Sequence, residues 1–437
     1  MPKRFATLAE WLAWFETLHP KKIDMGLDRI RVVLENLGLR EPPYRVVTVG
    51  GTNGKGSCVE ILASVYREAG HTTGAFTSPH LWAFNERIRV DGREATDAEL
   101  ISLFEAVDDA LGAVTLSYFE SSAAAALLYF ARRRVDVAVL EVGMGGRLDA
   151  TNAVDADGAL IASVDLDHQD YLGGDRETIG REKAGIMRSG RPVVVGDREP
   201  PQSVLEHARS IGAELEILGR DFDFRRENGS WTFEARGVPR HEGLPRVPFG
   251  GVVQYQNAAC CVALVDRLDG VLPVGDAALA RGLAGARLRG RADRHVLDGV
   301  EWVFDVAHNP AAAAAFRDIV GDLPPAPRTI AVFAAMHDKD HAGVLGRFVP
   351  TVDRWFVAGV DDERGAPADM LLDVLRRLGA ERAEACADVA AACAAAARDA
   401  RPGQRVLVFG SFYTVGPAME ALGLNLGLYS TPSEEGG

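Results

Sequence analysis

The sequence predicts an α/β protein with a P-loop-containing parallel-sheet N-terminal domain and a smaller Rossmann-like α/β C-terminal domain. Three observations support this fold class. Strand-like apolar runs alternate with helical patterns in the first half, a glycine-rich loop separates the first such strand from its helix, and a second alternation begins near residue 300. Ligands of such sheets bind beyond the carboxyl ends of the strands, so we expect the chemistry there.

The first domain is predicted from apolar runs and helical spacing. Its expected elements are, in order, a strand at 45–49, a helix at 58–69, a strand at 73–77, an alanine-rich helix at 121–134, and strands at 135–140 and 159–164. Basic residues, Arg132 to Arg134, form the last turn of the alanine-rich helix, where the helix dipole favours cations. Alternation between Phe222 and Phe233, around Asn228-Gly229, predicts a small antiparallel hairpin at the edge of this domain.

The second domain is predicted from a renewed alternation of strands and helices. Its expected strands lie at 300–305, 329–336, 355–359 and 405–410. We place the first domain at 1–290, the hinge in the Gly/Arg-rich stretch 285–294, and the C-terminal domain at 296–427. The small and polar residues of 428–437 predict a disordered tail.

The composition is that of a folded protein, with 437 residues, 47% hydrophobic and 25% charged. A net charge of −14 disfavours nucleic acid and anionic membranes as partners. The sequence contains no run of 18 apolar residues, which a membrane span would need, and residues 1–10 lack the pattern of a secretory signal. We therefore expect a cytoplasmic protein.

The five cysteines are scattered and show no CxxC spacing, which indicates neither a disulfide framework nor a zinc site. Cys260 and Cys261 lie in an apolar stretch and are expected to be buried.

The strongest local signal is the loop GGTNGKGS at 50–57, between a predicted strand and a predicted helix. Glycines let backbone N–H groups converge on a phosphate, the helix N-terminus adds partial positive charge, and Lys55 adds a full charge. The loop departs from the common P-loop because Gly56 separates Lys55 from Ser57. An ordinary tight turn is the alternative. Only six of the 48 basic residues are lysines, so a lysine inside a motif indicates that an amine is needed there.

Oxygen ligands for a divalent cation are expected at the same edge. Glu141 directly follows the buried strand 135–140, Asp165, Asp167 and His168 follow the strand 159–164, and Ser78 follows the strand 73–77. A lone histidine is more often structural, but acidic neighbours at a strand end favour His168 as a ligand.

For two further sites, Lys183 and residues 305–310, the sequence allows more than one interpretation. Lys183 is either a solvated helix lysine or an amine that reacts with CO₂ to give a carbamate, and the spacing does not decide between them. Asp305 to Pro310 (DVAHNP) follows the strand VEWVF. Its structural interpretation is an Asp or Asn helix cap, with Pro310 at the first helical position, and this is compatible with a functional role for the same residues.

Eight motifs, in order along nearly the whole chain, resemble folylpolyglutamate synthases of the ATP-dependent Mur-type amide ligases. These are GGTNGKGS, TSPH (77–80), EVGMGGRLDATN (141–152), DHQDYLG (167–173), REKAGI (181–186), QNAA (256–259), DVAHNP (305–310) and GSFYTVG (410–416). The segment LHPKKIDMGLDRI (18–30) is similar to the bifunctional members that are also dihydrofolate synthases.

The resemblance implies a set of site residues. The ATP phosphates would lie on Thr52, Asn53, Gly54, Lys55, Gly56 and Ser57, and the rest of the nucleotide on Asn257, Arg291 and Asp305. One Mg²⁺ would lie near Ser78 and Glu141 and a second near His168, beside carbamylated Lys183. Dihydropteroate would contact Asp24, Met25, Gly26 and Leu27, then Ser117, Tyr118, Phe119 and Glu120, and finally Leu148, Asp149 and Ala150. His308 and Ser411 match positions near the glutamate and phosphate end, with His308, Lys55 and Lys183 as the catalytic set.

The resemblance also implies the reaction. The γ-phosphoryl of ATP passes to a carboxylate of dihydropteroate or a tetrahydrofolate, and the amine of L-glutamate displaces phosphate from the acyl phosphate. The family suggests a monomer. Two departures are Ser117, where Thr is commoner, and Arg289-Gly290-Arg291, which lacks the Pro that usually precedes Gly-Arg and weakens the placement of Arg291.

Two alternative functions remain. A cell-wall Mur ligase shares the loop and the lysine, but Lys55-Gly56-Ser57 and DMGLDRI disfavour it. A nucleotide-binding regulator without catalysis would have no need of Glu141, His168 and Lys183.

Overall fold

The structure is a computed structural model that describes residues 4–21, 23–167, 169–227, 229–247, 251–362 and 364–424. Contacts among these residues divide the chain into two units. The first takes in residues up to Ser78, residues 84–247 and residues 254–287, and the second takes in Pro79–Ala83, 251–253 and 288–424.

The first unit is organised around a mixed sheet that is parallel over most of its width. Within the described residues it has eight strands in the order β4-β3-β2-β5-β1-β6-β7-β8. The strands are β1 Arg45–Gly50, β2 Thr73–Phe76, β3 Ile88–Val90, β4 Arg93–Glu94, β5 Val137–Glu141, β6 Gly158–Ile161, β7 Pro192–Val195 and β8 Glu214–Ile217. Among the strands that the structure describes, the antiparallel pairings of this sheet are β2–β3 and β3–β4, at one edge. The predicted parallel sheet is confirmed, with β1, β5 and β6 side by side.

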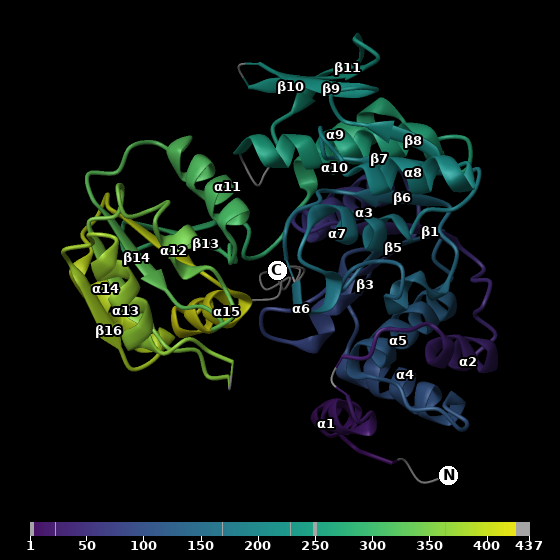
Figure 1. The fold of residues 1–437 in the computed structure, drawn as a ribbon, viewed down its shortest axis with the longest axis horizontal. Helices are drawn as coiled ribbons and strands as arrows, with labels where there is room; N and C mark the ends of the chain where they lie inside the picture. The colour runs from purple at the N-terminus through teal and green to yellow at the C-terminus, as the bar shows by residue number, and fades with distance from the viewer. Residues whose placement is uncertain are drawn as a thin grey trace, which may run out of the picture. The chain divides into compact units, whose positions relative to one another are not determined.

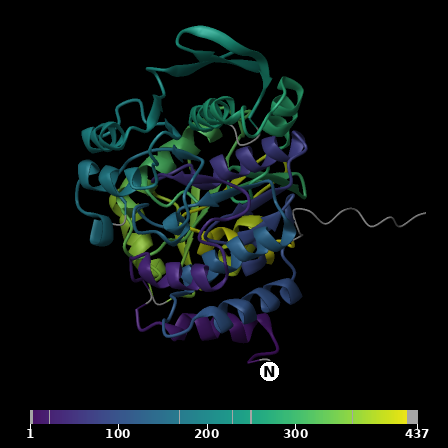
Figure 2. The same ribbon diagram turned by 90° about the vertical axis from the view of Figure 1, so that its right-hand side faces the viewer.

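Helices α3 and α5 pack directly against strands of this sheet. The described helices of the unit are α1 Leu8–Leu18, α2 Asp28–Asn36, α3 Lys55–Glu68, α4 Asp97–Ala110, α5 Tyr118–Arg133, α6 Gln169–Leu172, α7 Arg176–Ala184, α8 Gln202–Ile211, α9 Gly251–Leu268 and α10 Asp276–Gly285, with short 3₁₀ turns η1 Phe84–Arg87 and η2 Ala150–Ala153. Helices α1, α2, α4 and α5 (purple and blue in Figure 2) pack against one another. Phe15, Ile30, Phe104 and Phe130 belong to their apolar core. The predicted helix at 121–134 is confirmed but begins earlier, because Ser117 and Glu120 form a capping box.

A second, smaller sheet replaces the simple hairpin expected at 222–233. β9 Phe222–Arg226 and β10 Ser230–Ala235 pair antiparallel as predicted, and β11 Val238–Pro245 adds a third strand. Asn228, the first residue of the predicted turn, lies outside the described residues. His241 of β11 bonds Asp266 of α9 at 2.9 Å and Asp276 of α10 at 3.0 Å, which holds the sheet beside these helices (Figure 1).

The second unit is a Rossmann-like layer structure with its own core. In the described part of the chain its sheet has the order β12-β13-β17-β14-β15-β16, parallel except for the edge strand β12. Its elements are β12 Asp293–Leu297, β13 Val300–Asp305, α11 Pro310–Gly321, β14 Thr329–Phe333, α12 His341–Leu345, β15 Arg354–Ala358, α13 Ala368–Arg377, β16 Ala383–Cys386, α14 Val389–Asp399, β17 Arg405–Phe409 and α15 Phe412–Ala421. Apolar clusters lie on both faces of this sheet (yellow and green in Figure 1), with Trp355 in one and Trp302 in the other.

The expectation for the adjacent cysteines is confirmed in the described residues. Cys260 and Cys261 are buried, and burial raises the pKa of both thiols. No described helix is long and apolar enough to cross a membrane. The predicted tail at 428–437 lies outside the described residues.

Candidate active site

The glycine-rich segment follows β1 as predicted, but α3 begins at Lys55 and not at residue 58, so residues 55–57 form the first turn of the helix. Gly54 precedes the first helical residue with a positive φ of 86°, a conformation that favours glycine. In the described part of the chain, no side chain caps the N-terminus of α3. The Lys55 ammonium folds back and donates to the carbonyl oxygens of Gly51 at 2.9 Å and Thr52 at 3.2 Å. A loop closed around its own lysine in this way suits a phosphate group.

The loop is anchored on the segment that follows β6. Thr52 Oγ1 donates to the Asp165 carbonyl at 2.9 Å and accepts from the Asp165 N–H at 3.0 Å. Ser163 Oγ accepts from the Asn53 N–H at 3.0 Å and donates to the Asn53 carbonyl at 3.1 Å. These paired bonds fix the backbone of the loop against the neighbouring strand end, an anchor that the sequence did not reveal.

Asn257 lies over the same loop. A Cβ atom built on Gly54 would stand 2.7 Å from Asn257 Oδ1, so the two residues are in direct contact. Asn257 is buried in α9, and its Nδ2 donates to Gln254 Oε1 at 3.0 Å. The structure therefore brings together residues that are about 200 positions apart and that were both assigned to the nucleotide.

Oxygen donors meet at the carboxyl ends of β5 and β2. Glu141 is the last residue of β5 and is 5% exposed, and its Oε2 accepts from the Ser78 N–H at 3.0 Å. A buried carboxylate beside a phosphate loop fits a divalent cation, which takes oxygen ligands. His168, predicted as a second ligand, lies outside the described residues. Among the residues that are described, His, Cys, Asp and Glu form no group of three or more that could hold a metal ion.

Lys183 is not a solvated helix lysine. It lies in the last turn of α7 and is 3% exposed. Burial, and next the positive charge of Lys55, lower the pKa of the Lys183 amine to about 7, while Asp167 acts in the opposite direction. An amine with this pKa is available in its neutral, nucleophilic form near neutral pH.

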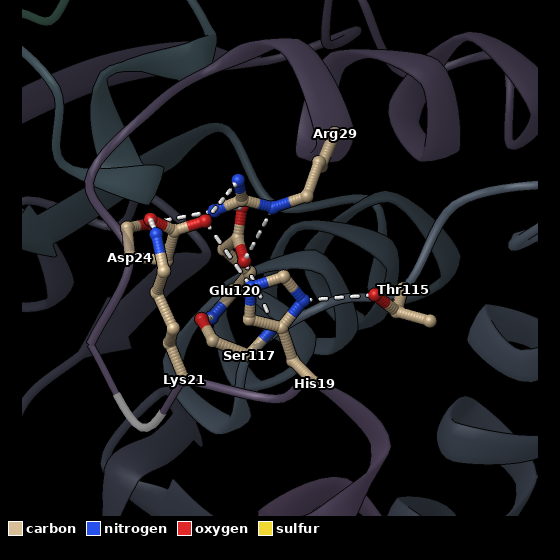
Figure 3. A network of polar contacts seen from close by, with 7 residues as sticks. All are labelled: His19, Lys21, Asp24, Arg29, Thr115, Ser117 and Glu120. Atoms are coloured by element: carbon tan, nitrogen blue, oxygen red, sulfur yellow. Dashed lines mark hydrogen bonds and ion pairs between the residues drawn. The ribbon is translucent and has the colours of Figure 1, made fainter.

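Two of the three segments expected to contact dihydropteroate lie against the loop between β5 and η2, which leads into the third segment, Leu148–Ala150. A Cβ atom on Gly145 would lie 3.6 Å from Met25 Cε, and one on Gly143 would lie 2.5 Å from Phe119 Cζ. Asp24 and Glu120 are both ion-paired to Arg29, at 2.7 and 3.2 Å (Figure 3). The loop after β5 thus lies against side chains from the other two segments.

Three of these residues, Ser117, Glu120 and Asp149, also have a local structural role. Ser117 and Glu120 form the capping box of α5, with the Ser117 N–H donating to Glu120 Oε2 at 2.8 Å. Asp149 is buried, accepts from the Met144 N–H at 2.9 Å and the Thr151 hydroxyl at 2.7 Å, and has a pKa raised chiefly by burial. These carboxylates shape the segments in which they lie.

In the second unit, Asp305 holds the backbone just before β12 and just after β13. Its carboxylate, 6% exposed, accepts from the Ala292 N–H at 2.8 Å and the Ala307 N–H at 2.9 Å. Burial raises the pKa of this carboxyl to about 6, opposed by the charge of Arg291. The Arg291 guanidinium lies 5.5 Å from the centre of the Phe412 ring. Asp305 is thus held beside Arg291, its predicted partner at the nucleotide.

His308 and Ser411 follow neighbouring strands of this sheet, β13 and β17. His308 Nδ1 bonds the Val306 carbonyl at 3.0 Å, so Nδ1 carries the proton in that bond. Ser411 precedes α15, and its hydroxyl bonds Thr414 Oγ1 at 2.7 Å. Asn309, not Asp305, caps α11, and Pro310 stands at the first turn as predicted.

Comparison with known proteins first defines the class. Residues 49–265 match the Mur ligase middle domain, and residues 290–412 match the Mur ligase glutamate ligase domain. Together these matches cover most of both units, so the fold and the loop are those of a Mur-type ligase.

Full-length relatives then define the family. The dihydrofolate synthase/folylpolyglutamate synthase of Escherichia coli (strain K12) is 41% identical over 422 residues, 96% of this chain and 97% of the relative. The structure of E. coli FolC in complex with DHPP and ADP superposes with a TM-score of 0.90 at 40% identity, covering 97% of this chain and 99% of that one. A bifunctional folylpolyglutamate synthase/dihydrofolate synthase with Mn, AMPPNP and L-glutamate bound gives 0.88 at 38% identity, covering 97% and 100%. The chain belongs to the dihydrofolate synthase/folylpolyglutamate synthase family.

Proposed function

We propose that this chain adds L-glutamate to dihydropteroate, giving dihydrofolate, and to tetrahydrofolyl glutamates, giving polyglutamates. It is an ATP-dependent ligase of folate metabolism. Solved relatives bind ADP or AMPPNP, Mn, L-glutamate and DHPP, which supports a nucleotide, a divalent cation and an acceptor carboxylate as the ligands of this chain.

The observation on this chain that most directly supports a ligase is the buried amine of Lys183. A cationic lysine that is 3% exposed and electrostatically opposed by Lys55 would destabilise the fold. The neutral amine nitrogen bonds the carbon of CO₂, one C=O π bond opens and a proton is released to solvent, which leaves a carbamate anion where a cation would otherwise lie. We propose that Lys183 is carbamylated and that this anion helps to hold Mg²⁺.

For the nucleotide, we propose that residues 52–57 bind the phosphates of ATP and that Asn257 contacts it from α9. Glu141 and Ser78 would hold one Mg²⁺ and His168 a second. The cation neutralises charge on the transferred phosphoryl group when bound. In the second unit, we assign Arg291 and Asp305 to the nucleotide and His308 and Ser411 to the glutamate and phosphate end.

The chemistry is two successive transfers. A carboxylate oxygen of the acceptor attacks the γ-phosphorus of ATP, the bond to the β,γ-bridging oxygen breaks, and ADP leaves. Lys55 stabilises the charge that develops on the phosphoryl oxygens. The neutral amine of L-glutamate then attacks the acyl carbon, loses a proton and expels phosphate. We propose that Asp24–Leu27, Ser117–Glu120 and Leu148–Ala150 hold the pteridine part of the acceptor.

The test is an assay of purified protein with ATP, Mg²⁺ and L-glutamate, in which dihydropteroate, tetrahydrofolate and no acceptor are compared. Phosphate release and product mass are both measured. Glutamylated products of both acceptors are expected. Glu141→Gln should lower turnover by about 100-fold or more, because it removes a cation ligand. Glu35→Gln, at an exposed position of α2, is the matched control.

The outcomes separate the hypotheses. Glutamylation of tetrahydrofolate alone would contradict the dihydropteroate assignment of Asp24–Leu27. Phosphate release that does not depend on an acceptor, without glutamylated product, would contradict the ligase activity as proposed.

A further inference from the structure

Arg29, which has no role in the assignments above, is the branch point of a polar network around the acceptor segments (Figure 3). It lies in the first turn of α2. Its Nη1 donates to Asp24 Oδ2 at 2.7 Å, and its Nη2 donates to the Asp24 carbonyl oxygen at 2.6 Å. The guanidinium therefore holds both the side chain and the backbone of Asp24, immediately before Met25.

The other side of the same guanidinium meets α5. Arg29 Nη2 lies 3.2 Å from Glu120 Oε1, and Nε donates to Glu120 Oε2 at 3.4 Å. Glu120 is 3% exposed and is fixed in turn by the Ser117 N–H. One planar side chain thus connects two segments that are about 90 residues apart in sequence. Only the forked guanidinium reaches all of these acceptors at once.

Lys21 and His19 also contact Asp24, but they are weaker candidates than Arg29 for holding the segment 24–27 in place. Lys21 Nζ lies 3.1 Å from Asp24 Oδ1, but its side chain is 68% exposed, and exposed pairs contribute little. His19 Nε2 lies 3.1 Å from Asp24 Oδ2, and its Nδ1 bonds Thr115 Oγ1 at 2.8 Å. The Arg29 side chain is 23% exposed and makes the shortest contacts, so it dominates the position of the loop.

We propose that Arg29 is a positioning residue for the acceptor substrate. It holds the backbone at 24–27 against α5, so that Met25 and Phe119 stay beside the loop 143–149 in the arrangement that dihydropteroate binds. Because the loop is ordered before binding, the substrate does not bear the entropy of ordering it. This inference rests on the proposed function, since it concerns the same acceptor site.

The test is the kinetics of Arg29→Lys. A lysine keeps a cation beside buried Glu120 but cannot bridge Glu120 and both oxygens of Asp24. The KM for dihydropteroate should rise about tenfold, while kcat and the KM for ATP stay within about twofold of wild type. Arg31→Gln, an exposed position two residues further along α2, is the matched control and should leave all three constants unchanged.

A second measurement keeps the test independent of catalysis. Amide hydrogen exchange of a peptide covering 19–27 should be faster in Arg29→Lys than in wild type, with exchange in 55–68 unchanged. If Arg29→Lys folds poorly, Arg29→Gln combined with Glu120→Gln removes the buried charge together with the bridge and should show the same rise in KM.

The two proposals fail in different ways. If wild-type protein does not glutamylate dihydropteroate, the proposed function is wrong for this acceptor. If wild type is active and Arg29→Lys leaves the KM for dihydropteroate unchanged, or raises the KM for ATP by the same factor, the positioning role is wrong.

Discussion

At the scale of single residues, the buried amine of Lys183 leads to the clearest prediction. Carbamylation requires the neutral amine, and the lowered pKa of about 7 supplies it near neutral pH, whereas an ordinary lysine titrates near 10.5. In CO₂-depleted buffer the protein should lose ligase activity, and bicarbonate should restore it more completely as the pH rises through 7. Lys183→Ala should lack ligation with or without bicarbonate. Arg181→Ala, at an exposed position of α7, is the control.

The lowered pKa of Lys183 also predicts how the free energy of unfolding depends on pH. Because the pKa of Lys183 is lower in the folded chain than in the unfolded one, the unfolded state binds more protons between about pH 7 and 10.5. In CO₂-depleted buffer the free energy of unfolding should therefore rise with pH over this window in wild type. Lys183→Ala should lack that part of the rise. Near wild-type ligation by this variant would contradict the catalytic role.

Site residues at the ends of strands could be predicted from the sequence. Residues whose role depends on contacts with distant parts of the chain could not. Glu141 and Asp305 were predicted because each ends an apolar run, and both are the last residues of buried strands. Arg29 was missed because its partner Glu120 lies 91 positions away, and no periodic pattern connects the two. The burial of Lys183 was likewise undecided, because it depends on how α7 packs.

At the scale of elements, the join between β1 and α3 depends on Gly54. Its φ of 86° and its contact with Asn257 both exclude a side chain. Gly54→Ala should cost about 1–2 kcal/mol of stability from backbone strain and should also displace Asn257. The KM for ATP should rise by about tenfold or more, because the phosphate-binding amides are moved. Isothermal titration with AMPPNP measures the binding directly.

Gly70 is the matched control at the other end of the same helix. Its φ is 92°, but a Cβ atom built on it would meet nothing within 4 Å. Gly70→Ala should therefore show a similar loss of stability with unchanged nucleotide binding. Equal effects of the two variants on binding would mean that the loop conformation at Gly54 has no particular role.

Elements were predicted well where apolar patterns were strong. The runs RVVTV and VDVAVL became β1 and β5, whereas the helices α1 and α4 were not anticipated. A signal was present for both, since Thr7 with Glu10 and Thr96 with Glu99 form capping boxes. β11 could not be foreseen, because VPRHEGLP contains two prolines and a glycine, which are unusual in strands.

At the scale of the whole molecule, the units are not divided at a single point in the chain. The boundary was predicted between 290 and 296, whereas contacts assign Leu288 onward to the second unit and add the short segment Pro79–Ala83. Such an assignment depends on tertiary packing of a few side chains, which composition does not reveal. Leu81 and Trp82 pack against the apolar cluster that contains Trp302 and Val415.

Trp82 should therefore stabilise the second unit, although it lies over 200 residues before it in sequence. Its Nε1 donates to the Gly416 carbonyl at 2.8 Å, and the Arg289 guanidinium lies 4.7 Å from the centre of its ring. Trp82→Ala should destabilise this unit by about 1–3 kcal/mol, because apolar contacts and one hydrogen bond are lost. Amide hydrogen exchange should accelerate in peptides from 300–320 and 405–421 and remain unchanged in 97–110.

Trp82→Phe separates the two contributions to that stability. It keeps a ring beneath Arg289 and most of the apolar contact but deletes the N–H donor, so the loss should be about 1 kcal/mol. Because the Gly416 carbonyl lies within α15, the acceleration in this variant should be confined to 405–421. Equal acceleration in 97–110 would show that the segment stabilises the molecule generally. No acceleration in any peptide would show that Pro79–Ala83 is dispensable to the second unit.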